Sequence, residues 1–116
     1  MVVLSEFFGS GGIAWEVVTS NITAKTNKGY MVDTSGGSKT ITLPASPKIN
    51  DKVGIKDFKK NSENNPITVS RNGQKIEGED YDFVINVNNQ GVTFVYSDTT
   101  SGWVRISDIF GPAIYD

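Results

Sequence analysis

The chain has 116 residues, which is enough for one small domain with a single hydrophobic core. It contains no cysteine and no histidine, which excludes disulfides, thiol redox chemistry, imidazole or thiolate metal sites, and Ser-His-Asp or Cys-His nucleophile systems. The net charge of −2 gives no electrostatic attraction to nucleic acid or to an anionic membrane, so we expect neither as a partner.

Residues 1–12 form an apolar head that ends in the glycine-rich sequence Gly9-Ser10-Gly11-Gly12. Such a composition is typical of a flexible hinge. The head has no basic n-region and is too short to span a bilayer. We therefore expect neither a signal peptide nor membrane insertion.

Residues 13–107 alternate between apolar and polar side chains with the period of two that predicts half-buried β-strands. In the segment 39–43, for example, Ile41 and Leu43 share one face and two threonines share the other. No window of ten or more residues carries a helical pattern. Further strands are expected at 15–19, 21–25, 30–33, 53–56, 67–70, 83–87, 92–96 and 103–106.

Turn sequences separate nearly all of the expected strands. The strongest is Asn72-Gly73, because a type I′ turn needs positive φ at both central residues and asparagine and glycine tolerate it. The pattern predicts an all-β fold, a small antiparallel β-sandwich or barrel-like domain.

Residues 108–116 form a short apolar tail that is broken by Gly111 and Pro112. Exposed apolar segments mark association surfaces, although in a monomer the head and tail would fold back on their own domain. We favour docking onto a neighbouring chain. The predicted docking or oligomer-interface residues are Phe7, Phe8, Ile109, Phe110, Ile114 and Tyr115.

Acidic residues cluster around Gly78. Calcium prefers several oxygen ligands, which makes this turn a weak metal candidate, but its spacing fits no EF-hand loop and a solvated turn explains it as well. We predict no metal and no cofactor. The residues of the weak candidate are Glu77, Glu79, Asp80 and Asp82.

The residues suggest two other chemistries. A glycosidase needs two carboxylates across a cleft, and the chain has no insertion large enough to build one, so we predict that it is not an enzyme. Aromatic rings can stack on sugars, and the candidate glycan contacts are Tyr30 and Trp103. The alternative function is therefore a carbohydrate-binding module that adheres to host surface glycans.

Residues 20–107 resemble a module that recurs in tail-fibre and other structural proteins of bacteriophages. The order and spacing of several strand-and-turn motifs carry the resemblance, and each motif alone is weak. The motifs are Gly29–Gly37, Thr40–Pro47, Asp51–Asp57, Pro66–Val69 with Arg71–Gly73, Ile76–Gly78, Val92–Tyr96 and Gly102–Arg105.

The resemblance implies a non-enzymatic virion structural protein that assembles as a homotrimer. Fibre proteins are usually long, whereas here the module is nearly the whole sequence. We therefore expect a small accessory part, namely a capsid decoration protein, a head or vertex fibre, or a short tail or baseplate component. The apolar head and tail would attach it to other virion proteins of the capsid or tail.

Overall fold

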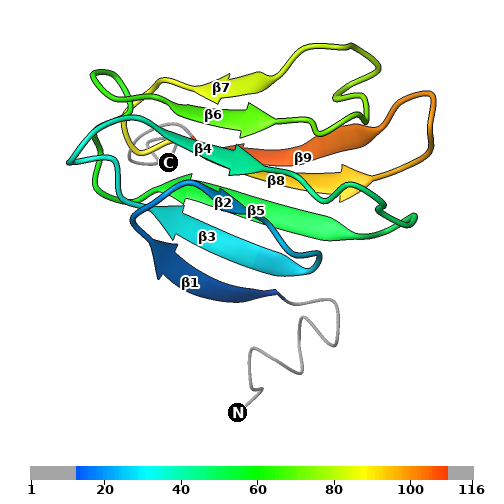
Figure 1. Ribbon diagram of the computed structural model, residues 1–116, viewed down its shortest axis with the longest axis horizontal. Coiled ribbons are helices and arrows are strands. Elements are labelled where there is room, and N and C mark those ends of the chain that lie inside the picture. The colour runs from blue at the N-terminus through cyan, green and yellow to red at the C-terminus, as the bar shows by residue number, and fades with distance from the viewer. Residues whose placement is uncertain (1–12, 110–116) are drawn as a thin grey trace, which may run out of the picture.

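The computed structural model describes the backbone of residues 13–109 and the side chains of residues 13–106. This part of the chain forms nine strands and no helix, and therefore no helix that could cross a membrane. The strands are β1 (Ala14–Val18), β2 (Ile22–Thr23), β3 (Lys28–Val32), β4 (Lys39–Thr42), β5 (Lys52–Asp57), β6 (Ile67–Ser70), β7 (Phe83–Ile85), β8 (Gly91–Tyr96) and β9 (Trp103–Ile109) (Figure 1).

The strands form two sheets, and consecutive strands alternate between them from β1 to β6. Sheet A has the order β1-β3-β5-β8-β9, and sheet B has the order β2-β4-β6-β7. Strands β1, β3 and β5 are parallel to one another, as are β2, β4 and β6. The first six strands therefore form three turns of a flattened coil, and β1 and β7 lie at opposite ends of the molecule (Figure 1).

The last three strands pair antiparallel and close the coil. Strand β7 pairs with β6, and β8 pairs with both β5 and β9. The β8–β9 ladder shifts register between Thr93 and Phe94, which is a β-bulge. Strand β9 continues past Ser107 to Ile109, so the ladder runs beyond the expected boundary of the β domain.

The all-β, two-sheet architecture is confirmed, and the expectation of purely antiparallel sheets is wrong. Period-two alternation reports which side chains are buried, and it is the same for parallel and antiparallel neighbours. Pairing depends on the connections, which here carry the chain from one sheet to the other. Thr40 on β4, for example, donates its backbone N–H to Asn21 Oδ1 in the β1–β2 connection, 2.8 Å away.

The core lies between the two sheets. Sheet B places Ile22, Ile41 and Val69 in one cross-strand row, and sheet A places Tyr30 beside Ile55. Apolar side chains from both sheets are fully buried there: Val32, Ile41, Leu43, Val53, Ile55, Ile67, Val69, Ile85, Phe94 and Trp103. Their removal from water is the main stabilising contribution to the fold.

The Asn72-Gly73 turn is confirmed, with φ of 52° and 87° at its two central residues. Gln74 donates its backbone N–H to the carbonyl of Arg71 across the turn, at 3.2 Å. The turn lies inside the longer connection 71–82 between β6 and β7, so it does not join two strands directly.

Candidate interaction surface

Sheet A has an inner face toward the core and an outer face on the other side, because successive side chains point to opposite faces of a strand. The register aligns two outward cross-strand rows from β1 to β8. The first row is Trp15, Gly29, Gly54 and Thr93, and the second row is Val17, Met31, Lys56 and Gly91. We call these eight residues the outer face of sheet A.

The indole of Trp15 lies across the two glycines of its own row. A Cβ atom added to Gly54 would be 2.6 Å from Trp15 Cη2 and 3.1 Å from Ile13 Cδ1. A Cβ atom added to Gly29 would collide with the atoms at the ring fusion of the same indole. The glycines thus allow a close approach that no other residue type permits, and they fix one face of the ring against the sheet.

An open hollow of about 290 Å³ lies beside the Trp15 ring. It spans four strands of sheet A, from β1 to β8, and its walls are mainly apolar. Its lining residues are Trp15, Met31, Ile55, Lys56, Gly91, Val92 and Thr93.

Lys56 supplies the positive charge among the lining residues of this hollow. Its ammonium donates to the carbonyl of Asn89 at 2.6 Å. Partial burial lowers the pKa of Lys56 below its ordinary value, because desolvation disfavours the charged form. The hollow is therefore an apolar site with one cation at its wall, a composition that suits an apolar segment with an acidic group.

Strand β1 forms one edge of sheet A and is largely exposed. Four of its five residues are exposed, and the exposed fractions of Trp15 and Val17 are 44% and 52%. The edge of the strand that faces away from β3 has no strand partner among the described residues. An exposed apolar edge strand is a template for pairing with another chain.

The acidic turn around Gly78 is stabilised by local partners. Glu77 Oε2 accepts the backbone N–H of Arg105 at 3.1 Å, and Asp82 Oδ1 accepts that of Arg71 at 3.0 Å. Asp80 forms ion pairs with Lys75 at 3.1 Å and Arg71 at 3.4 Å. Within residues 13–106, no three carboxylates converge as a metal site would require.

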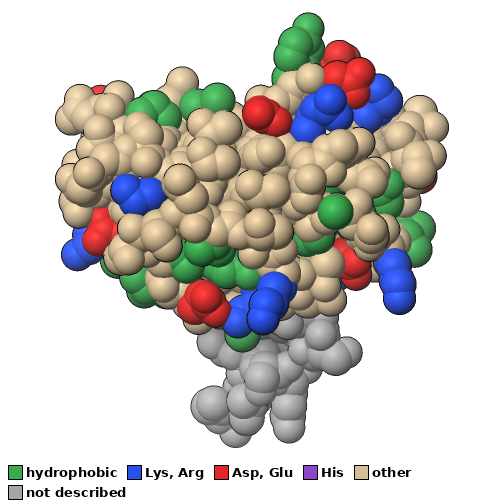
Figure 2. All heavy atoms as spheres, viewed as in Figure 1, with side chains coloured by type: hydrophobic (Ala, Val, Ile, Leu, Met, Phe, Trp, Pro, Cys, Tyr) green, Lys and Arg blue, Asp and Glu red, His purple; other side chains and the backbone are tan. Residues whose placement is uncertain are grey.

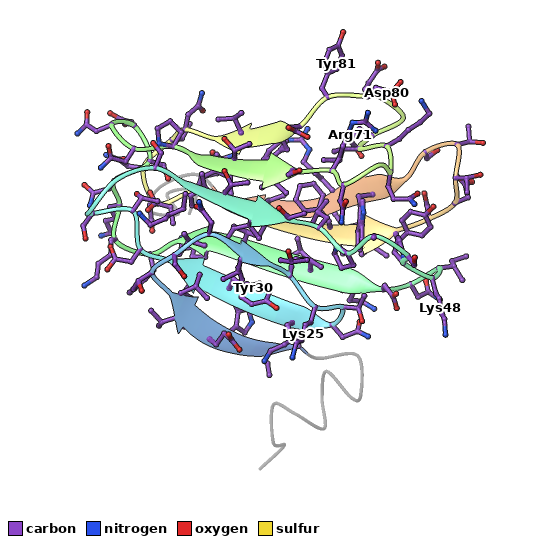
Figure 3. All side chains as sticks on the ribbon, in the orientation of Figure 1. Lys25, Tyr30, Lys48, Arg71, Asp80 and Tyr81 are labelled. Atoms are coloured by element: carbon purple, nitrogen blue, oxygen red, sulfur yellow. The ribbon has the colours of Figure 1, made fainter. Side chains whose placement is uncertain are left out.

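The charged groups of this turn gather in one corner of the molecule (Figures 2 and 3). The hydrogen bond and the positive charge from Lys75 hold the pKa of Asp80 below its ordinary value. The group therefore keeps its negative charge in the folded chain, and Lys75 and Arg71 balance that charge.

The two candidate glycan contacts lie in the core. The exposed fractions of Tyr30 and Trp103 are 2% and 0%. Tyr30 Oη accepts the backbone N–H of Lys25 at 2.8 Å (Figure 3), and the Trp103 ring packs edge-on against Tyr96 at 5.4 Å between centroids. Neither ring has a face that a sugar could stack on.

Among residues 13–106, the exposed aromatic residues are instead Trp15 and Tyr81, whose exposed fractions are 44% and 73%. The position of Trp15 could not be inferred from the sequence, because its environment depends on which glycines the register places beside it. The alternation that predicts the strand 30–33 puts Tyr30 and Val32 on one face, and that pattern already favoured burial of Tyr30.

The predicted docking residues Phe7, Phe8, Phe110, Ile114 and Tyr115 lie outside the described residues. Ile109 is the last residue of β9, and its register partner is Gly91. Its backbone is therefore part of the sheet, next to the hollow that Gly91 lines.

Comparison of the sequence with protein-family models and with curated proteins gives no match.

Proposed function

We propose that this chain is a non-enzymatic structural protein of a bacteriophage particle, and that it acts as a homotrimer attached to capsid or tail proteins. The succession of strand-and-turn motifs over residues 20–107, which resembles the phage fibre module, supports this proposal. The all-β fold and the absence of a converging carboxylate group among residues 13–106 are consistent with a structural role.

The observation that carries the proposal is the exposed edge of β1. Val17 leaves apolar surface in water on this strand, and the apolar head 1–12 joins the chain just before it. Strand addition by a second copy would pair the free backbone groups and cover part of the Val17 side chain. Three copies in one assembly would then present three heads, which strengthens attachment through multivalency.

The test of attachment uses the full chain with Phe7→Ser and Phe8→Ser, which removes the apolar side chains of the head. We expect this variant to fold and to be absent from purified virus particles, as measured by quantitative mass spectrometry of the particles. The matched control is Tyr81→Ser, an exposed aromatic residue far from the head in sequence, which should be incorporated at the normal level. Normal loading of the head variant, or absence of the wild-type chain from particles, would overturn the proposal.

A second candidate function, adhesion to glycans, has one observation in its favour. Tyr81 projects from the β6–β7 connection (Figure 3) and lines a hollow of about 210 Å³ together with Glu77, Glu79, Asp82 and Arg105. An exposed ring beside carboxylates suits sugar hydroxyls and ring faces. Retention on immobilised host polysaccharide that Tyr81→Ser abolishes would favour this function, and no retention of the folded wild-type chain would exclude it.

A further inference from the structure

The hollow on the outer face of sheet A lies beside the point where the C-terminal segment leaves the sheet. Strand β9 ends at Ile109, which pairs with Gly91, and Gly91 lines the hollow. The same cross-strand row continues through Lys56 and Met31 to Val17. The described part of β9 therefore ends one strand away from the rim.

The segment 110–116 is long enough to cross the hollow. Its seven residues span at most about 23–25 Å when extended. Neighbouring strands lie about 4.8 Å apart, so the distance from β9 to β1 is about 19 Å. A segment that turns across the sheet after Ile109 is therefore long enough to reach Trp15 on β1.

The chemistry of the segment matches the chemistry of the hollow. Its apolar residues Phe110 and Ile114 suit walls formed by Trp15 and Met31. Asp116 is its one charged side chain, and Lys56 is the one charged residue among those that line the hollow. Opposite charges on the two partners favour their association.

The head is a less suitable occupant. The residues next to Ile13 are Gly9-Ser10-Gly11-Gly12, which bring little side-chain surface, and ordering glycine costs more conformational entropy than ordering other residues. A second copy has no covalent tether at the rim of the hollow. The tail is already tethered at the rim, at an effective concentration on the order of millimolar.

We propose that residues 110–116 of the same chain bind in the hollow on the outer face of sheet A, with Ile114 packed beside Trp15. This contact covers Trp15 from the outer face of sheet A, whereas strand addition uses the unpaired backbone edge of β1, and it does not depend on the proposed role in a virus particle. It assigns the tail to its own domain and leaves the head as the attachment segment.

The first experiment uses cysteine pairs, because the chain has no native cysteine to interfere. Met31→Cys lies in the hollow, and Ala113→Cys is about three strand spacings from β9 along an extended tail. We expect the double variant to form an intramolecular disulfide about tenfold faster than the control pair Thr68→Cys and Ala113→Cys. Thr68 lies in β6 of the other sheet.

Two results of this experiment would overturn the proposal. One is equal rates for the Met31 pair and the Thr68 pair. The other is a disulfide-linked dimer from co-expressed single variants, Met31→Cys in one copy and Ala113→Cys in another, at the expense of the intramolecular product. That dimer would assign the hollow to a second copy.

The second experiment measures acrylamide quenching of Trp15 in the full chain. Trp103 is fully buried and gives a constant background. We expect the variant Phe110→Ser with Ile114→Ser to raise the quenching constant of Trp15 about twofold, because the ring loses its cover. The head variant Phe7→Ser with Phe8→Ser should leave it unchanged. An increase in the head variant alone, or in neither variant, would contradict the assignment.

Discussion

The indole of Trp15 occupies the space that a side chain would need on Gly54, two strands away in sheet A. A Cβ atom on Gly54 would be 2.6 Å from Trp15 Cη2, closer than two such atoms can approach. Trp15 is half-exposed, and yet two glycines in neighbouring strands leave room for it. The ring is therefore packed against the sheet as part of the outer face of sheet A.

Gly54→Ala tests this packing. We expect it to lower the free energy of unfolding by about 1–3 kcal/mol and to displace the indole, because the new methyl group overlaps the ring. Chemical denaturation measures the first effect, and a red shift of the tryptophan fluorescence measures the second. Gly36→Ala, where nothing lies within 4 Å, is the control and should be nearly neutral.

The double variant Trp15→Ala with Gly54→Ala separates packing from backbone effects. Once the ring is gone, the methyl group on Gly54 meets no indole, so the cost of Gly54→Ala should largely vanish in the Trp15→Ala background. The same cost in both backgrounds would show that the indole does not cover Gly54.

Gly102 and Gly73 form a second matched pair, because both have positive φ, 70° and 87°. A Cβ atom on Gly102 would overlap the carbonyl group of Lys75 and lie 2.8 Å from its Cα, whereas one on Gly73 meets nothing within 4 Å. We expect Gly102→Ala to cost more than about 3 kcal/mol and Gly73→Ala about 1 kcal/mol, from backbone strain alone. Equal losses in thermal or chemical unfolding would contradict the close approach of Lys75.

The sequence predicts where the strands lie but not which strands pair. All nine strands lie at or near the predicted segments, since alternation such as that of Ile41 and Leu43 reports burial directly. Partner choice depends on long-range contacts, so the parallel pairing of β1 with β3 could not be derived from local pattern. Trp103 is a candidate glycan contact in the sequence, but it is fully buried in the structure. A strand residue next to a glycine turn is ambiguous from sequence alone, so its burial could not be predicted.

Asp57 is a buried carboxylate that holds two connections together. It accepts the backbone N–H groups of Asn61 at 3.2 Å, of Ser62 at 3.0 Å and of Asn89 at 3.0 Å. Asp57→Ala should lower the free energy of unfolding by about 2–4 kcal/mol, because it leaves buried donors without an acceptor. Asp98→Ala also removes an acceptor of two backbone N–H groups, but in an exposed turn, and should cost less than about 1 kcal/mol. The reverse order in urea unfolding would disprove this role of Asp57.

Asp33 predicts a specific dependence of stability on acid. Hydrogen bonds from the hydroxyl and the backbone N–H of Ser35 hold its pKa below the ordinary value of 3.8. A lowered pKa in the folded chain stabilises it above that ordinary value, and the contribution is lost as the pH falls through the folded pKa. Asp33→Asn should therefore reduce the drop in Tm between about pH 5 and about pH 2.

Ser35→Ala is the companion variant, because it removes the hydroxyl that lowers the pKa of Asp33 and keeps the carboxylate. It should reduce the same drop in Tm, and by less than Asp33→Asn does. An unchanged acid dependence in both variants, followed by circular dichroism, would refute the contribution of this turn.

The most direct test of the proposed function is the mass of the full chain in solution, measured by light scattering coupled to size exclusion. The account predicts three times the mass of one chain for the wild type and for Val84→Lys, an exposed residue of the edge strand β7. It predicts a single-chain mass for Val17→Lys, because a charge on the β1 edge opposes strand addition. A single-chain mass for the folded wild type, or a trimer that Val17→Lys leaves intact, would contradict it.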